Sequence, residues 1–298
     1  MGLAWLGLVR KAAGEIYVLM ARELKKWYRS PFLLMMTLVQ PIIWMGLFGK
    51  ALNLTGLLRI PDELLRQLPP NITSQIAAVF NTVLSRFFGS TEIDYFTYMS
   101  VGMISIVILF TSMSSGMGIA WDRRLGFLNK LLAAPIWRGS IIISRVLAGV
   151  FRSVVQASML LLVAIALGAR YNPLWPLGPI AAFLALFMLS LGLASLFIAL
   201  GVRLKSWESQ MAVMNLLNLP LMFASNALYP LEMMPAWLRT VAQANPISYA
   251  VDTVRQTLVL GQAANTSAII LNLGAVTAFA ITLTAVGIML ADGGLRRK

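Results

Sequence analysis

Two residue types that carry much of protein chemistry are absent from this chain. It contains neither histidine nor cysteine, which excludes thiol nucleophiles, imidazole acid-base chemistry and the usual zinc sites. No Gly-x-x-x-x-Gly-Lys-Ser/Thr pattern occurs either, so the loop with which many ATPases cradle phosphates is missing. We therefore predict no catalytic residue, no metal site and no cofactor in this chain. The residues that could bind other molecules lie in two stretches that connect long apolar segments.

The first stretch, residues 122–135, combines leucines with basic residues. A short helix with an apolar ridge and a basic rim is suited to dock into a groove of a partner protein. Gly126 would let another backbone approach closely, and Pro135 would end the helix. The alternative is a basic loop that only sets membrane topology. The candidate docking residues are Asp122, Arg123, Arg124, Gly126, Phe127, Leu128, Leu132 and Pro135.

The second stretch, residues 245–255, has the start signals of a helix. Asn245 suits the N-cap and Pro246 suits the first helical position. Apolar residues then recur at helical spacing, while Asp252 and Arg255 lie three apart on another face. We therefore predict an amphipathic helix in this connection.

A short helix is also predicted just before this one, since Pro235 precedes a helix-forming run that contains Trp237. Together the two helices would form an external hairpin over residues 231–260 that re-enters the outer leaflet, with Trp237 at headgroup depth. The alternative is a plain amphipathic loop outside the membrane.

Composition identifies the setting of both stretches as a bilayer. The chain is 59% apolar and 12% charged with a mean hydropathy of +0.79, whereas soluble domains carry roughly 25% charged residues. The net charge of +13 lies beside apolar segments, which favours anionic lipid headgroups over nucleic acid as its partner. Six segments approach the ~20 residues that cross a bilayer as a helix. They are Phe32–Gly49, Tyr98–Ala120, Ile141–Gly168, Pro179–Val202, Met211–Tyr229 and Ser267–Ala291.

Six spans place both termini on one side, and the basic residues indicate which. Sixteen Lys and Arg residues lie on the side of the termini and seven in the opposite loops. The positive-inside rule then predicts that both termini lie in the cytoplasm. We expect the protein in the plasma membrane. Arg145 and Arg152 fall in the first half of the third span, where we expect their long side chains to snorkel toward the headgroups. Arg152 is the one buried charge that we expect.

Three further parts complete the predicted all-α architecture of six transmembrane helices. Residues 1–31 form an amphipathic helix that either lies in the inner interface as a functional element or merely anchors the chain. The external loop 50–94 is long enough for two short helices, and residues 32–298 form the transmembrane domain. The expected charged face of the first helix comprises Lys11, Glu15, Arg22, Lys26 and Arg29, and its apolar face comprises Val9, Ile16, Met20 and Trp27.

With these elements in place, the chain resembles the membrane-spanning subunit of type-2 ATP-binding-cassette exporters. The resemblance covers nearly the whole length, including an interfacial helix, six spans and a coupling helix of the form Asp-Arg-x-x-Gly-x-Leu-x-x-Leu-x-x-x-Pro. Before the last span it adds a series of short motifs. They are Tyr229-Pro230-Leu231, Met234-Pro235, Asn245-Pro246 and Arg255. Within the family the chain looks most similar to daunorubicin-type multidrug and lipo-oligosaccharide permeases.

This resemblance implies the permease subunit of an ATP-driven exporter for amphipathic drug-like or lipid-like substrates. A homodimer of permeases would assemble with separate ATPase subunits, which would hold ATP and Mg, and the coupling helix would sit in an ATPase cleft. The first, second and fifth spans would line the pathway, although polar residues there also serve as hydrogen bonds between helices. The pathway candidates are Gln40, Trp44, Thr111, Ser112, Asn215 and Asn218.

Two other classes of protein compete with this interpretation. An ion-coupled secondary transporter would show internal repeats and a charge near the bilayer midplane, and we find no repeats and only Arg152 as such a charge. A membrane-embedded enzyme would need convergent acidic or nucleophilic groups at membrane depth, whereas the eleven acidic residues fall almost entirely in predicted loops.

Overall fold

The computed structural model describes residues 2–51, 94–204 and 206–296, together with a few residues between 69 and 82. Within these residues the secondary structure is helical and includes no strand, so the predicted all-α class is confirmed. The two helices predicted for the loop 50–94 lie almost entirely outside the described residues.

The described helices differ widely in length, from single turns to 31 residues. Their bounds are α1 Gly2–Tyr28, α2 Pro31–Trp44, η1 Met45–Ala51, α6 Tyr95–Arg124, α7 Phe127–Ala133, α8 Arg138–Ala166, α9 Leu177–Arg203, α10 Trp207–Phe223, η2 Leu231–Met233, α11 Ala236–Ala244, α12 Pro246–Arg255, η3 Gln256–Leu260, η4 Gly261–Ala263 and α13 Thr266–Arg296.

Four of these helices are long and apolar enough to cross a membrane, namely α6, α8, α9 and α13. The first predicted span divides into α2, which has 14 residues and contains Pro41, and the π-helix η1. The fifth is α10, whose 17 residues end at Phe223 because the chain turns at Ala224. The count of six spans therefore stays a prediction. Among the described helices, four are long and apolar enough to be spans.

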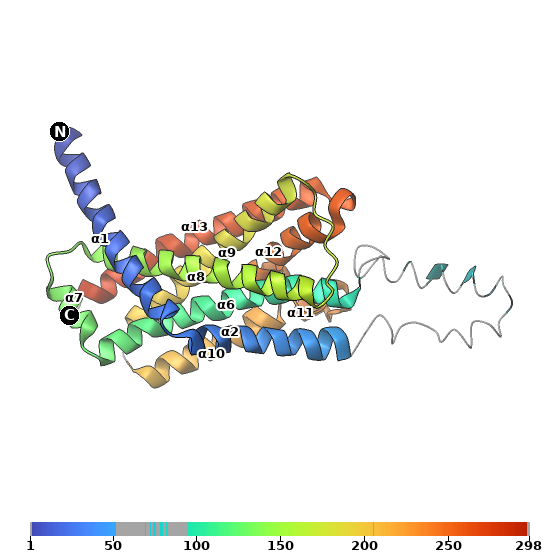
Figure 1. Cartoon of the computed structure of the whole chain (residues 1–298), viewed down its shortest axis with the longest axis horizontal. Coiled ribbons are helices and arrows are strands. Elements are labelled where there is room, and N and C mark those ends of the chain that lie inside the picture. Colours follow the sequence, from blue (N-terminus) through green and yellow to red (C-terminus); the bar gives the residue numbers. More distant parts are fainter. Residues whose placement is uncertain are drawn as a thin grey trace.

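Helix α6 is the centre of the bundle and is buried along most of its length. It packs against α8 and α9, and α9 packs in turn against α13 (Figure 1). The α6–α9 contact depends on small residues, since a Cβ atom at Gly116 would lie only 2.4 Å from the Phe197 carbonyl oxygen. Such close approach of two backbones is typical of helix packing in membranes.

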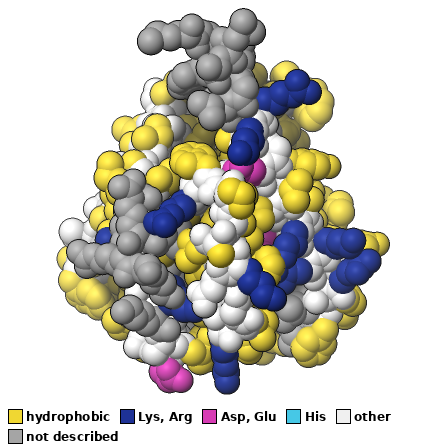
Figure 2. Space-filling view, turned by 90° about the vertical axis from the view of Figure 1, so that its left-hand side faces the viewer, with side chains coloured by type: hydrophobic (Ala, Val, Ile, Leu, Met, Phe, Trp, Pro, Cys, Tyr) yellow, Lys and Arg dark blue, Asp and Glu magenta, His cyan; other side chains and the backbone are white. Residues whose placement is uncertain are grey.

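The two ends of the bundle carry different elements. The basic end holds α7, the end of α13 and much of α1, and Figure 2 shows Lys and Arg side chains among apolar ones on this face. Exposed Arg124, Lys130, Arg138 and Arg203 belong to it. The hairpin end, at the opposite side of Figure 1, holds α11 and α12. These terms are kept below.

Candidate functional site at the basic end

A short helix, α7, lies within the stretch 122–135 and is separated from α6 by a single tight turn. Gly126 has a φ of 71°, a left-handed conformation that glycine adopts without strain, and α7 begins at the next residue. A Cβ atom at Gly126 would meet nothing within 4 Å. Within the chain the left-handed backbone conformation by itself favours glycine here, and close approach of a partner's backbone at Gly126 stays a prediction. Helix α7 ends at Ala133, before the extended residue that precedes Pro135.

The eight candidate docking residues divide by exposure. Arg124 and Pro135 are exposed, whereas Asp122 and Leu128 are buried and the other four are half-buried. Arg123 turns inward, where its guanidinium donates to the carbonyl oxygens of Leu204 at 2.5 Å and Val202 at 2.6 Å. Any partner of α7 could therefore contact only its exposed and half-buried residues, whereas buried Leu128 packs α7 against the bundle.

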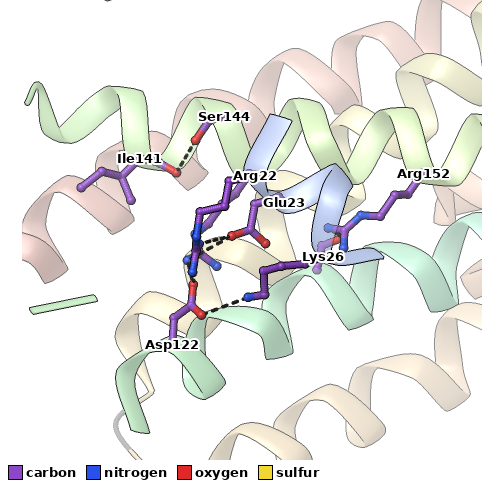
Figure 3. Close-up of polar contacts among 9 residues, drawn as sticks. Arg22, Glu23, Lys26, Asp122, Ile141, Ser144 and Arg152 are labelled. Carbon is purple, nitrogen blue, oxygen red and sulfur yellow. Dashed lines mark hydrogen bonds and ion pairs between the residues drawn. The ribbon is translucent and has the colours of Figure 1, made fainter. Parts of the chain in front are cut away.

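Asp122 is the centre of an ion-pair cluster that joins three helices (Figure 3). Its side chain is 1% exposed and forms an ion pair with Arg145 of α8. From α1, Lys26 Nζ approaches Asp122 Oδ1 at 3.1 Å and Arg22 Nη1 approaches Oδ2 at 3.5 Å. Glu23 completes the cluster, with its Oε1 atom 2.7 Å from Arg22 and 3.9 Å from Arg145. Opposite charges therefore attach α1 to the ends of α6 and α8.

Part of the expected charged face of α1 contacts the bundle. Arg22 and Lys26 approach Asp122, and Glu15 accepts a hydrogen bond of 2.9 Å from Ser140. Lys11 and Arg29 of the same face are exposed, and the position of α1 in the membrane interface stays a prediction. Helical periodicity separates charged from apolar side chains but cannot identify which side has a protein partner. A further contact runs from α1 to α7, where the Arg22 guanidinium lies 3.5 Å from the centre of the Phe127 ring.

Buried charge is also more extensive than the sequence suggests. The expectation that Arg152 is the one buried charge is wrong, since Arg145 is 4% exposed and Arg255 6% exposed, each beside specific partners. Acidic residues are likewise buried outside loops, with Asp122 inside α6 and Glu23 inside α1. The sequence offered no signal for Glu23 or Arg145 as partners of Asp122, because the three lie on separate helices.

A cavity of about 450 Å³ opens beside this cluster and extends inward between α1, α2, α6 and α8. We call it the Arg152 cavity. Arg152 donates to Ser115 Oγ at 3.1 Å and to the Ala148 carbonyl oxygen at 3.2 Å. Gln156 binds Thr37 and Thr111, which closes the inner wall. The lining residues are Glu23, Lys26, Trp27, Ser30, Thr37, Thr111, Ser114, Met117, Gly118, Trp121, Asp122, Leu125, Arg152 and Gln156.

The structure does not bring the six pathway candidates to one site within the chain. Thr111 lines the Arg152 cavity, whereas Ser112 is buried and its hydroxyl lacks a partner among the described residues. Gln40 and Asn215 are exposed on α2 and α10. Trp44 and Asn218 are half-buried, and the Trp44 ring lies 6.1 Å from that of Phe223, which links α2 to α10.

The hairpin end contains the other group of predicted residues. Asn245 caps α12 as predicted, since its side chain accepts a hydrogen bond from the Ile247 amide at 3.0 Å. Pro246 begins the helix, and Pro235 precedes α11. Entry of this hairpin into a leaflet stays a prediction.

Asp252 and Arg255 of α12 have separate partners. Asp252 Oδ2 accepts from Asn272 of α13 at 2.6 Å. The Arg255 guanidinium donates to the Ala227 carbonyl oxygen at 3.2 Å and to that of Tyr98 at 3.3 Å, and it lies 3.4 Å from the centre of the Tyr98 ring. Arg255 therefore joins α12 to α6 and to the turn after α10.

Comparison with known proteins places this architecture in a family. The family model described as ABC-2 type transporter matches residues 14–259. A protein named as a transport permease, ycf38, of Cyanophora paradoxa is 30% identical over 242 residues, which are 81% of this chain and 73% of that protein. The ycf38 protein of Porphyra purpurea is 31% identical over 81% of this chain and 72% of its own length.

A protein named as a daunorubicin resistance ABC transporter permease, from Streptomyces coeruleorubidus, is 26% identical over 57% of this chain and 59% of its own length. The resemblance predicted from the sequence is therefore confirmed. The chain belongs to the ABC-2 type transporter family of membrane permeases.

Proposed function

We propose that this protein is the permease subunit of an ATP-driven exporter and that α7 is its contact with a separate ATPase subunit. Members of its family are membrane subunits that work with an ABC ATPase. The observation that carries the proposal is the position of α7, a short helix with exposed Asn129 and Lys130 that directly follows the most deeply buried helix of the bundle. A force applied to α7 therefore acts on α6.

The contacts around α7 support transmission of such a force. The turn at Gly126 is short, and Arg123 attaches the end of α6 to the end of α9. Phe127 contacts Arg22 of α1, so α1 would move with α7. At its other end α6 holds Arg255 of the hairpin through the Tyr98 carbonyl and ring. ATP-driven closure of the ATPase pair would thus reach both ends of α6 as a rigid-body shift.

The transported substrate is proposed to be amphipathic and drug-like or lipid-like. Relatives named for daunorubicin and doxorubicin resistance support a drug-like cargo. Two copies would pair through α2 and α10, whose outward faces are apolar, and Gln40 and Asn215 would then face the shared pathway. The exposed apolar residues of these helices include Phe32, Met35, Ile43, Leu216 and Leu219. The homodimer would lie in the plasma membrane with both termini in the cytoplasm.

A charge reversal on α7 tests the assignment. Lys130→Glu should abolish co-purification with the cognate ATPase and reduce substrate-stimulated ATP hydrolysis at least tenfold, because it places a like charge against the acidic side of any groove that fits a basic rim. The matched control is Arg170→Glu, an exposed arginine at the hairpin end, which should leave both unchanged. Equal behaviour of the two variants would exclude α7 as the contact.

The rival function is an ion-coupled secondary transporter. Transport by the purified permease alone in liposomes, driven by a proton or sodium gradient without the ATPase, would establish that function instead. Under the proposal, export requires the ATPase and ATP, and an imposed ion gradient has no effect.

A further inference from the structure

Around the ion-pair cluster and the Arg152 cavity, the described cations outnumber the described carboxylates. Arg22, Lys26, Arg145 and Arg152 are four cations, whereas Glu23 and Asp122 are the two acidic residues among them, which leaves an excess of two positive charges. Arg145, Arg22 and Lys26 each have a carboxylate within 4.0 Å. Among the described residues Arg152 has none within that distance.

The position of Arg152 makes this imbalance costly. It is the middle residue of α8, with 14 residues on either side, in a helix that is long and apolar enough to cross a membrane. An arginine at the centre of a spanning helix costs about 2.5–3.5 kcal/mol even by insertion scales, and such residues usually face a cavity with a function. Its described hydrogen bonds occupy two of the five N–H donors that a guanidinium carries.

We propose that the Arg152 cavity binds the anionic group of an amphiphile. A carboxylate or phosphate beside Arg152 could accept a paired hydrogen bond from the guanidinium. Gln156 and Ser114 supply further polar groups in the same cavity, and Lys26 lines it beside Asp122. The apolar chain of the ligand would lie against Trp27, Met117 and Trp121, which line the remaining wall.

The size and opening of the cavity favour this class of ligand. Its volume of about 450 Å³ lies within the range of ~300–1,000 Å³ that small-molecule sites occupy. Figure 3 shows Arg152 extending from α8 toward the turn of α1 that bears Lys26. Arg152 and three members of the ion-pair cluster, Glu23, Lys26 and Asp122, therefore line the same cavity. The inference needs neither an ATPase nor transport, so its failure would leave the proposed function intact.

Binding by the purified full-length chain in a neutral detergent tests the proposal. Dodecyl phosphate should bind saturably and raise the unfolding temperature, whereas zwitterionic dodecylphosphocholine and inorganic phosphate should not. Arg152→Gln should weaken dodecyl phosphate binding at least tenfold, about 1.4 kcal/mol, and Arg152→Lys should recover part of that loss because it restores the charge. Arg170→Gln, at an exposed arginine far from the cavity, should bind as the wild type does.

A second pair of variants keeps the proposal testable if Arg152→Gln does not fold. Gly118 lines the cavity, and a Cβ atom there would meet nothing closer than Arg145 Nη1 at 3.8 Å, so Gly118→Leu fills space without displacing backbone. It should weaken dodecyl phosphate binding at least tenfold. Gly14→Leu, on α1 where a Cβ atom meets nothing within 4 Å, is the matched control and should bind normally.

Three outcomes would overturn the proposal. They are equal dodecyl phosphate affinity of wild type and Gly118→Leu, an equal response to dodecylphosphocholine, or an equal response to inorganic phosphate. Native mass spectrometry after exchange into phosphatidylglycerol nanodiscs distinguishes the sources of the anion. A retained phosphatidylglycerol molecule that Arg152→Gln loses would support a membrane lipid as occupant. Its absence, with dodecyl phosphate binding intact, would support a single-chain amphiphile.

Discussion

At the basic end Arg145 is buried against Asp122, whereas at the hairpin end Arg255 is buried against carbonyl oxygens and the ring of Tyr98. The first arrangement pairs opposite charges from three helices, including α1 at the edge of the bundle. The second uses neutral acceptors of α6 and of the turn after α10. The basic end therefore depends on how separate helices are placed relative to one another, while the hairpin end depends on backbone groups that α6 and its neighbour hold in place.

The two kinds of contact should respond differently to a shift of α1 or of α12. If α1 shifts, Asp122 exchanges one cation for another and keeps Arg145, so the cluster can rearrange without leaving a carboxylate unpaired. In the part of the chain that the structure describes, Arg255 forms no ion pair that could be exchanged, and its acceptors are backbone carbonyls. Under the proposed function, a basic end that rearranges and a hairpin end that keeps its shape would suit rigid-body transmission through α6.

The largest expected effect is that of Asp122→Ala. It leaves Arg145 buried without its close carboxylate, and breaking a buried pair in this way costs about 3–5 kcal/mol. Reversible unfolding in mixed micelles should show this loss, and adding Arg145→Met should recover most of it. A loss below about 1 kcal/mol would mean that the Asp122–Arg145 pair contributes no more than a solvent-exposed ion pair.

Arg255→Met should have the next largest effect, a loss of about 2 kcal/mol, because it leaves the carbonyls of Tyr98 and Ala227 without their donor. A double variant then distinguishes the hairpin end from the basic end. Asp252 is bonded to Asn272, so Asp252→Asn combined with Arg255→Met should be additive within about 0.5 kcal/mol, unlike the pair at the basic end. Recovery of stability in the double variant would show that the hairpin end is also an ion pair.

Gly126→Ala should have the smallest effect, a loss of about 1–2 kcal/mol from the left-handed backbone alone. Since a Cβ atom there meets nothing, Gly126→Leu should cost the same as Gly126→Ala in unfolding measurements. Gly14→Ala, in a helical and open position, should instead stabilise the chain by about 0.5–1 kcal/mol. A much larger loss for Gly126→Leu than for Gly126→Ala would indicate a close neighbour at this turn.

Much of the local structure was predictable because its causes are local. The N-cap at Asn245, the end of α7 before Pro135 and the apolar length of α6 each follow from a few adjacent residues. A short helix within the stretch 122–135 was predictable from its composition, whereas docking of this helix stays a prediction. The division of that stretch into exposed and buried residues was not predictable, because the partners of Asp122 and Leu128 come from distant parts of the chain.

The sequence by itself determined that this chain is an all-helical membrane permease of the ABC-2 type without a phosphate-binding loop of its own. Only the tertiary structure decided that Glu15, Arg22 and Lys26 contact the bundle, that Arg152 lines a cavity and that Arg255 binds carbonyl oxygens. The physical reason is the distance along the chain over which each interaction acts. Helix signals and apolar length act over neighbouring residues, whereas the neutralisation of a buried charge depends on which helices lie beside it.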